Sequence, residues 1–237
     1  TPMVLYYLKY SILDAARADC TTLFGGMTAE DDRRDAGQHV EIVGRWSTVG
    51  ESAGFCICRA ESASALHAWM LNWSSMATIE CVPVVDDNQA RRILLRQLGE
   101  EDEGSYTVDY SRAISGPKPG ESLFWIEYQF YSDKREEGTT IFARLTKERD
   151  EADAGANTCY GRWHNLGTGS GAVLCSSKSE EDLYTWASHW MHVCECMVRP
   201  VVTDAECRKN IKAKPDFADK HAALMAAAGK KKAWFWR

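Results

Sequence analysis

Two histidines and two cysteines stand close together late in the sequence, in the pattern His189-x-x-His192-x-Cys194-x-Cys196. Imidazole nitrogens and thiolates are ligands that zinc prefers, so this spacing could hold a metal ion. Recognised zinc motifs, however, use Cys-x-x-Cys pairs, and this stretch has none. Strand periodicity also places Cys196 on the same face as Val198, which is typical of a small buried side chain. We therefore expect no metal site and no cofactor.

Nucleophilic and phosphate-binding chemistry also lack their usual patterns. No serine has the surrounding glycines of a nucleophile elbow, and no Ser or Cys stands in a triad-like order with a base. The glycines between positions 161 and 171 fall in an expected hairpin, whereas a phosphate-binding loop leads from a strand into a helix. The sequence thus predicts a protein that is not an enzyme.

Composition limits the class of protein further. The 237 residues are 45% hydrophobic and 26% charged, as expected of a folded globular chain. A net charge of −6 argues against a general nucleic-acid binder, which needs excess Lys and Arg to neutralise phosphates. No stretch approaches the roughly 18 apolar residues of a membrane-spanning helix. The nine cysteines are odd in number and irregularly spaced, so we expect mostly reduced thiols.

An internal duplication organises the chain. Gly44-Arg45-Trp46 recurs as Gly161-Arg162-Trp163, and the offset of 117 holds without a gap to Arg91 and Arg208. Of these 48 aligned positions 15 are identical, where about three would agree by chance. Nearer the N-terminus the register slips by one residue. Three of the matched pairs are tryptophans: Trp46 with Trp163, Trp69 with Trp186, and Trp73 with Trp190.

Each copy has the pattern strand, helix, strand, strand, helix, strand. The first strands are expected at residues 4–12 and 123–131, and a polar helix follows, clearest at 140–152. In the first copy Gly25-Gly26 interrupts that helix. Residues 39–48 and 54–60 form a hairpin, and the second helices begin at Ser62 and Ser179. A short charged helix closes each copy.

This order predicts an α+β fold of two ferredoxin-like βαββαβ repeats. Sheet packing on sheet would close them into an internal pseudo-dimeric α/β barrel. The expected boundaries are 1–98 for the first repeat, 99–120 for an acidic and proline-containing linker, 121–213 for the second repeat, and 214–237 for a C-terminal helix and tail.

Charged residues are expected where the two repeats meet. If Tyr6 and Tyr10 face the helices, Lys9 faces the opposite side of its strand, as Glu127 does in the second copy. Lys9 and Glu127 occupy equivalent positions with opposite charge, and a buried charge must be paired. We therefore expect an internal interface network of four residues: Lys9, Glu127, Arg45 and Arg162.

The sequence resembles the dimeric α/β-barrel superfamily and, within it, a small bacterial-type family of unknown function. The similarity is carried by Leu5-Tyr6-Tyr7-Leu8, by Trp46, by Leu66-His67-Ala68-Trp69 with Trp73, and by Ile79-Glu80-Cys81-Val82-Pro83-Val84. The resemblance implies the barrel fold but no single activity, because the superfamily includes cofactor-free monooxygenases, haem-handling enzymes and proteins without known activity.

The same resemblance implies an alternative function, a small-molecule or haem-binding enzyme of the cofactor-free monooxygenase type. Its pocket would lie between sheet and helices, lined by His67, His164, Trp46 and Trp163. The opposing interpretation is that these tryptophans fill the core and the histidines lie at its edge.

The C-terminal tail combines positive charge with aromatic residues: Lys230, Lys231, Lys232, Trp234, Phe235, Trp236 and Arg237. Such a tail suits a membrane surface or an acidic, apolar groove on another protein. We therefore expect a non-catalytic accessory subunit that docks on the protein subunits of a larger complex, such as a photosystem or respiratory supercomplex. The start at Thr1-Pro2-Met3 suggests a processed leader, which indicates an organelle interior, the chloroplast stroma ahead of the mitochondrial matrix.

Overall fold

The computed structural model describes residues 2–101 and 115–230, with side chains up to residue 227. The chain divides into two compact units, unit 1 with Thr1–Val82 and Val202–Arg237, and unit 2 with Pro83–Val201. These units differ from the two sequence repeats, because each unit includes the closing helix of the other repeat. The expected boundaries of 1–98 and 121–213 divide the sequence into repeats, whereas the boundaries at 82/83 and 201/202 divide the chain by packing.

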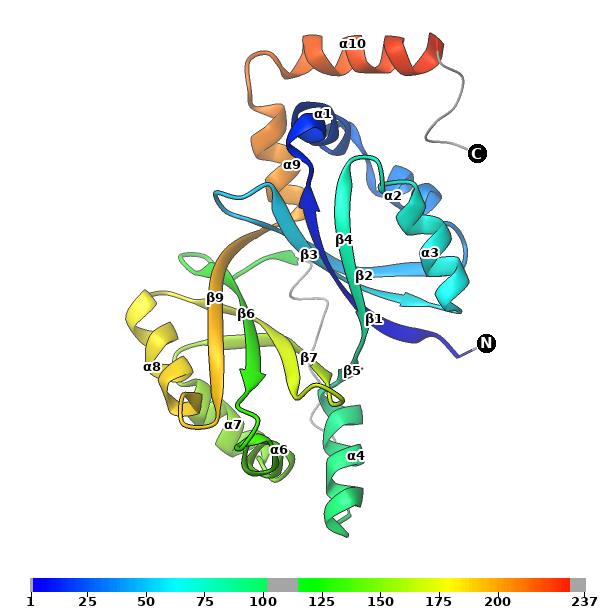
Figure 1. Cartoon of the computed structure of the whole chain (residues 1–237). Coiled ribbons are helices and arrows are strands. Elements are labelled where there is room, and N and C mark those ends of the chain that lie inside the picture. Colours follow the sequence, from blue (N-terminus) through cyan, green and yellow to red (C-terminus); the bar gives the residue numbers. More distant parts are fainter. Residues whose placement is uncertain (1, 102–114, 231–237) are drawn as a thin grey trace. The chain divides into compact units, whose positions relative to one another are not determined.

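Unit 1 contains a sheet with the strand order β4-β1-β3-β2 (Figure 1). Its elements are β1 (Val4–Ile12), the 3-10 turn η1 (Asp14–Ala16), α1 (Arg17–Gly26), α2 (Ala29–Ala36), β2 (Val40–Thr48), β3 (Ala53–Ala60), α3 (Ala63–Leu71), β4 (Ala77–Pro83), α9 (Asp204–Lys212) and α10 (Phe217–Lys230). Helices α9 and α10 come from the end of the chain and pack against α1.

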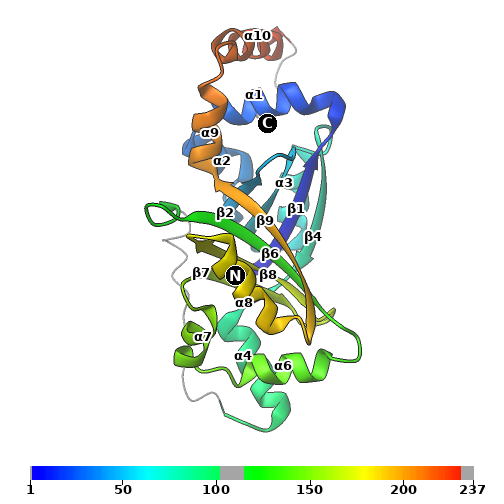
Figure 2. The ribbon, with the colours of Figure 1, turned by 90° about the vertical axis from the view of Figure 1, so that its left-hand side faces the viewer.

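Unit 2 repeats this plan with the strand order β9-β6-β8-β7-β5. Its elements are β5 (Val85–Asp86), α4 (Asp87–Leu98), β6 (Ser122–Phe130), α6 (Arg135–Ala143), α7 (Lys147–Ala154), β7 (Thr158–Asn165), β8 (Ser170–Ser177), α8 (Glu180–Trp190) and β9 (Cys194–Thr203). Helix α4 lies beside α6 (Figure 2), and the short strand β5 pairs with β7. The strand order 4-1-3-2 of the ferredoxin-like pattern is thus present in both units.

Apolar side chains of the two units occupy equivalent positions between sheet and helices. In unit 1 the core cluster includes Leu8, Cys56, Cys58, Leu66 and Trp69. In unit 2 the corresponding cluster includes Ile126, Val173, Cys175, Leu183 and Trp186. The helix-facing sides of the first strands, β1 and β6, were therefore predicted correctly.

Most helix starts follow local capping chemistry. The side chains of Ser62 and Ser179 accept hydrogen bonds from Ala65 N and Asp182 N, so both serines cap their helices as expected. The expected helix at 140–152 is wrong in one respect, because it is two helices, α6 and α7. Helix α6 ends at Ala143, and the Thr146 side chain accepts from Arg149 N to start α7.

Gly25 and Gly26 lie at the end of α1, where other helices approach closely. A Cβ on Gly25 would collide with the Ile211 side chain of α9. One on Gly26 would collide with the His221 ring of α10. A side chain at either position would therefore require its neighbour to move.

Both hairpins contain a β-bulge at matching places. The pairing of β2 with β3 shifts between Ile42 and Gly44, and that of β7 with β8 shifts between Cys159 and Gly161. An extra residue in one strand reverses the alternation of side chains after it. Arg45 consequently pairs with Cys56, which also pairs with Leu8. Because Leu8 and Cys56 face the helices, Arg45 faces the helices too.

Candidate ligand cavity and its duplicated ion cluster

A cavity of about 760 Å³ lies in unit 1, between the helix-facing side of the sheet and helices α1 and α9. Apolar and aromatic side chains line most of it, including Leu8, Cys56, Trp69, Trp73 and Ile79. Charged side chains that also line it are exposed and mark its mouth: Asp14, Arg17, Glu51, Lys214, Asp216 and Lys220. The interior is thus suited to an apolar body.

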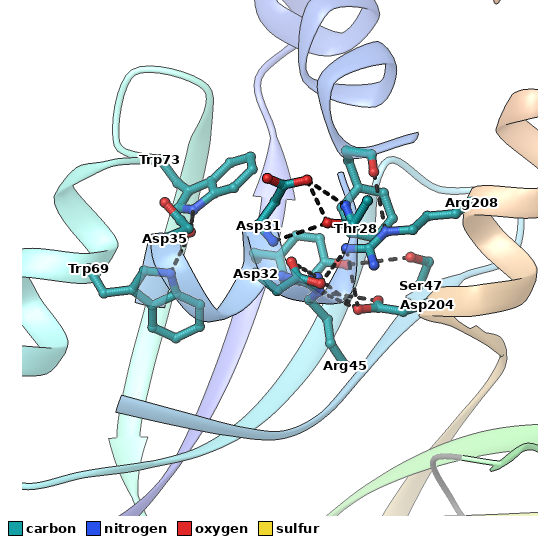
Figure 3. Close-up of polar contacts among 12 residues, drawn as sticks. Thr28, Asp31, Asp32, Asp35, Arg45, Ser47, Trp69, Trp73, Asp204 and Arg208 are labelled. Atoms are coloured by element: carbon teal, nitrogen blue, oxygen red, sulfur yellow. Dashed lines mark hydrogen bonds and ion pairs between the residues drawn. The ribbon is translucent and has the colours of Figure 1, made fainter. Parts of the chain in front are cut away.

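Arg45 forms one wall of the cavity and is held between two carboxylates (Figure 3). Its Nη2 donates to Asp204 Oδ2 at 2.7 Å and to Asp32 Oδ1 at 2.8 Å, and its Nε donates to both Asp204 oxygens at 3.0 and 3.1 Å. Only 9% of its side chain is exposed. Burial alone would lower the pKa of Arg45, but the charge and hydrogen bonds of Asp204 keep that pKa well above its usual range.

A second arginine completes this cluster. Arg208 Nη2 donates to Asp32 Oδ2 at 2.6 Å, and its Nε donates to the Phe24 carbonyl at 3.3 Å. Both guanidinium groups also lie over the Phe24 ring, at 4.8 Å for Arg45 and 4.5 Å for Arg208. Two arginines face two aspartates, so the cluster carries no net charge.

Tyr10 places a hydroxyl in the cavity. Its Oη lies 3.5 Å from Ser47 Oγ, at the limit of a hydrogen bond. Burial raises the pKa of Tyr10 well above its usual value, so the phenol stays protonated at neutral pH. Gly54 lies beneath the phenol, and a Cβ there would collide with the Tyr10 hydroxyl.

Two cysteines that line the cavity are kept as thiols. Burial raises the pKa of Cys20 to about 11, and burial also raises the pKa of Cys207. Because the thiolate is the nucleophilic form, neither side chain is activated for covalent chemistry at neutral pH.

Helices α2 and α3 are joined by one carboxylate that accepts from two indoles. Trp69 Nε1 and Trp73 Nε1 both donate to Asp35 Oδ2 at 2.7 Å (Figure 3). The same arrangement occurs in unit 2, where Trp186 Nε1 and Trp190 Nε1 donate to Asp153 Oδ2 at 2.9 Å.

Unit 2 contains an equivalent ion cluster. Arg162 Nη2 donates to both Asp150 oxygens at 2.6 and 2.8 Å, and its Nη1 donates to Asp87 Oδ2 at 3.2 Å. Arg91 lies 3.7 Å from the same Asp87 oxygen. Burial would raise the pKa of Asp87, but Arg162, His164 and Arg91 outweigh it and lower that pKa to about 2.

His164 fills the centre of this second site. Its Nδ1 lies 2.6 Å from Tyr128 Oη and its Nε2 lies 2.8 Å from Asp87 Oδ1, so both ring nitrogens are bonded. The ring also packs on Phe142, with centroids 4.5 Å apart. The cavity here measures only about 70 Å³.

The two cavities lie at equivalent positions of the two repeats and differ in how much space their side chains leave open. Their shared residues include five aligned pairs: Leu8 with Ile126, Tyr10 with Tyr128, Arg45 with Arg162, Trp69 with Trp186 and Trp73 with Trp190. In unit 2 larger side chains replace smaller ones at three positions: Phe130 for Ile12, His164 for Ser47 and Cys194 for Ala77.

The expected interface network of Lys9, Glu127, Arg45 and Arg162 is wrong for the two arginines. Both face the helices and bond aspartates, because the β-bulges reverse their side of the strand. Lys9 lies on the other face, 6.0 Å from the Phe55 ring centroid, and Glu127 bonds Arg199 at 2.5 Å. The pairing of Lys9 with Glu127 stays a prediction.

The expected pocket of His67, His164, Trp46 and Trp163 is also wrong as a group. His67 is exposed on α3, and only His164 lines a cavity. Trp46 and Trp163 lie on the sheet face opposite the helices, where Trp163 stacks on Trp125 with ring centroids 5.4 Å apart. The bulges that turned the arginines toward the helices turned these tryptophans away.

The remaining sequence candidates have separate outcomes. His189 Nδ1 lies 2.9 Å from Asp153 Oδ1, and no group of three metal-ligating side chains occurs in the part of the chain that the structure describes.

Lys230 is the last residue of α10. Lys231, Lys232, Trp234, Phe235, Trp236 and Arg237 lie outside the described residues, so the docking tail and its organellar partner complex stay predictions. No described helix is long and apolar enough to span a membrane.

The aspartates of the ion clusters were missed from the sequence. Asp87 aligns with Asp204 at the offset of 117, and Asp32 and Asp35 align with Asp150 and Asp153 at 118. The available signal was that these aspartates are identical in the two copies, at an offset of 117 or 118, whereas most other charged residues differ between the copies.

Comparison with known proteins supports the duplication and the fold. The family model described as "Domain of unknown function (DUF3303)" matches residues 5–98 and 122–215, one domain in each repeat. No curated protein matches the chain significantly in sequence.

Among solved structures, a mutant chlorite dismutase from Candidatus Nitrospira defluvii in complex with cyanide is 8% identical, with a TM-score of 0.51. The match covers 89% of this chain and 95% of that one. A DypB variant of Rhodococcus jostii in complex with heme is 10% identical over 88% of this chain and 96% of that one, with a TM-score of 0.44. The first likeness shows the dimeric α/β-barrel fold and nothing about activity.

Proposed function

Because the chain belongs to the DUF3303 family and carries its domain twice, we propose that the first copy binds a small, largely apolar organic molecule in the unit 1 cavity. The supporting observation is the contrast between two equivalent sites, of about 760 Å³ and about 70 Å³. Pockets for organic ligands typically measure roughly 300–1,000 Å³.

The apolar side chains that line this open space lack packing partners on one side. The second copy closes the same space with ordinary substitutions such as Ile12 to Phe130. Side chains fill the site in the second copy but leave it open in the first. This difference favours a bound molecule in the open site.

The lining sets the chemistry of that molecule. Trp69, Trp73 and Leu8 offer apolar surface, and Tyr10 offers one hydroxyl. The charge of Arg45 is already balanced by Asp32 and Asp204. The site therefore favours a neutral ligand with a flat apolar body over an anion.

Haem does not fit these residues. Among the residues that the structure describes, no histidine lines the large cavity. Cys20 and Cys207 are held as thiols and Tyr10 as a phenol, whereas each of these groups must lose its proton to ligate iron. His164 in the small cavity has both nitrogens bonded.

Binding of a fluorescent apolar probe tests the proposal. We expect 1-aminoanthracene to bind the full chain at one site with a dissociation constant of about 10 µM, a typical value for a ligand of its size. The double variant Ile12→Phe, Ala77→Cys, which copies the side chains of unit 2, should weaken binding at least tenfold. Tyr184→Ala, on an exposed part of α8, is the matched control and should bind as the original chain does.

No saturable probe binding, or equal binding by the double variant and the control, would contradict a ligand site in this cavity. Thermal unfolding of each variant verifies that a loss of binding is not a loss of folding.

A further inference from the structure

The second unit holds an imidazole where the first unit has space. In unit 2, the His164 ring bridges Tyr128 Oη and Asp87 Oδ1 at 2.6 and 2.8 Å and lies against Phe142. All three neighbours recur in unit 1, as Tyr10, Asp204 and Phe24, but the histidine is replaced by Ser47.

The exposure of the two aspartates shows the effect of this replacement. The side chain of Asp87, beneath the imidazole, is 3% exposed, whereas that of Asp204 is 25% exposed. Their arginine partners differ little, with 7% for Arg162 and 9% for Arg45. Asp32 is also more exposed than its counterpart Asp150, at 15% against 3%, but the carboxylate that lacks an imidazole is the most exposed group of its cluster.

Tyr10 and Asp204 each have hydrogen-bonding capacity left. Among the residues that the structure describes, the Tyr10 hydroxyl has one hydrogen-bond partner, Ser47 Oγ, which lies at the distance limit of 3.5 Å. Asp204 Oδ1 accepts one hydrogen bond, from Arg45 Nε at 3.1 Å, and the same N–H also donates to Asp204 Oδ2. A carboxylate oxygen can accept two, so Oδ1 has room for another donor.

We propose that the unit 1 cavity recognises an imidazole-type ring that is fused to or carries an apolar group; this inference rests on the proposed function. The ring would occupy the position that the His164 side chain has in unit 2. One ring nitrogen accepts a hydrogen bond from the Tyr10 hydroxyl, and the other ring N–H donates to Asp204. The apolar part lies against Trp69 and Trp73. The second copy thereby carries, as a side chain, the group that the first copy binds as a ligand.

Benzimidazole and indole form the matched pair of probes. They have the same size and shape, and both carry an N–H donor, but only benzimidazole has a ring nitrogen that accepts. Isothermal titration of the full chain should show at least tenfold tighter binding of benzimidazole.

Variants separate the ring's two contacts. Ser47→His places an imidazole in the slot and should abolish benzimidazole binding, while Tyr10→Phe should reduce the preference over indole to less than threefold. Tyr184→His adds the same side chain at an exposed position of α8, outside the cavity, and should change neither affinity.

Equal affinities for benzimidazole and indole, or unchanged benzimidazole binding by a folded Ser47→His variant, would overturn the imidazole inference. The proposed function survives that result if 1-aminoanthracene still binds. If neither the heterocycles nor 1-aminoanthracene bind, the proposed function fails and the inference fails with it.

Discussion

At the scale of single residues, the main feature is an arginine with two carboxylates, built twice. Removing one partner of a buried ion pair leaves the other charge desolvated and without compensation, which costs more than the intact pair contributes. Arg162 and Asp87 are nearly inaccessible to solvent, whereas Asp204 in unit 1 is partly exposed. The same substitution should therefore have different consequences in the two copies.

We expect Asp87→Asn to lower the free energy of unfolding by about 3 kcal/mol, because Arg162 and His164 lose their charged partner in a buried site. Asp204→Asn should cost roughly 1 kcal/mol, since water can screen a partly exposed group. Urea denaturation followed by tryptophan fluorescence measures both. Equal losses would show that burial does not control the cost.

The pKa of Asp87 also predicts a dependence of stability on pH. This pKa is about 2 in the folded chain against 3.8 for the ordinary side chain. The carboxylate therefore stabilises the fold fully above about pH 4, and its contribution of about 2 kcal/mol is lost as the pH falls toward 2. Unfolding measured between pH 2 and 5 should show a steeper decline for the original chain than for Asp87→Asn.

Little of this residue-level site could be predicted from the sequence. Strand alternation correctly placed Lys9 opposite Tyr10, but it failed for Arg45 and Trp46 because one bulged residue reverses the faces of a strand. The carboxylates come from polar helices at a shifted offset, so no local spacing connects Asp32 with Arg45 or Asp204.

At the scale of elements, sequence signals were more informative. The serine caps, the hairpins and the matched tryptophans predicted the order and approximate boundaries of most strands and helices. The break between α6 and α7 escaped prediction because the amphipathic pattern continues across it. The junction of α2 with α3 also escaped it, since that junction depends on one carboxylate, Asp35, which bonds two indoles.

Asp35→Ala should lower the free energy of unfolding by about 2 kcal/mol, because two indole N–H groups lose their acceptor. Glu30→Ala, on an exposed position of the same helix, should stay within about 0.5 kcal/mol of the original chain. Chemical denaturation of the two variants provides the comparison, and near-ultraviolet circular dichroism should change only for Asp35→Ala. A loss as small as that of Glu30→Ala would contradict a structural role for the carboxylate.

At the scale of the whole molecule, repeats and compact units are different divisions of one chain. Unit 2 needs α4 for Asp87 and Arg91, although α4 is the closing helix of the first repeat. The duplication in sequence could not show this, because the repeat pattern is equally consistent with each closing helix packing on its own copy.

A fragment of residues 83–201 should therefore be more stable than one of residues 99–215, although their lengths are almost equal. The second fragment lacks Asp87 and leaves Arg162 with Asp150 alone, so we expect its free energy of unfolding to be lower by about 3 kcal/mol or more. Thermal and urea unfolding of both fragments checks this. Greater stability of residues 99–215 would mean that the repeat, and not the compact unit, is the cooperative element.

The division of unit 1 between both ends of the chain also has a consequence for synthesis on the ribosome. Arg45 leaves the ribosome 159 residues before Asp204, an interval of roughly 10–30 seconds at ordinary translation rates. Unit 2 is continuous and is complete once Val201 has emerged, whereas the first repeat still waits for one wall of its cavity, which includes Cys207 and Ile211. A released chain that ends just before α9 would thus contain all of the second unit but would lack that wall of the cavity.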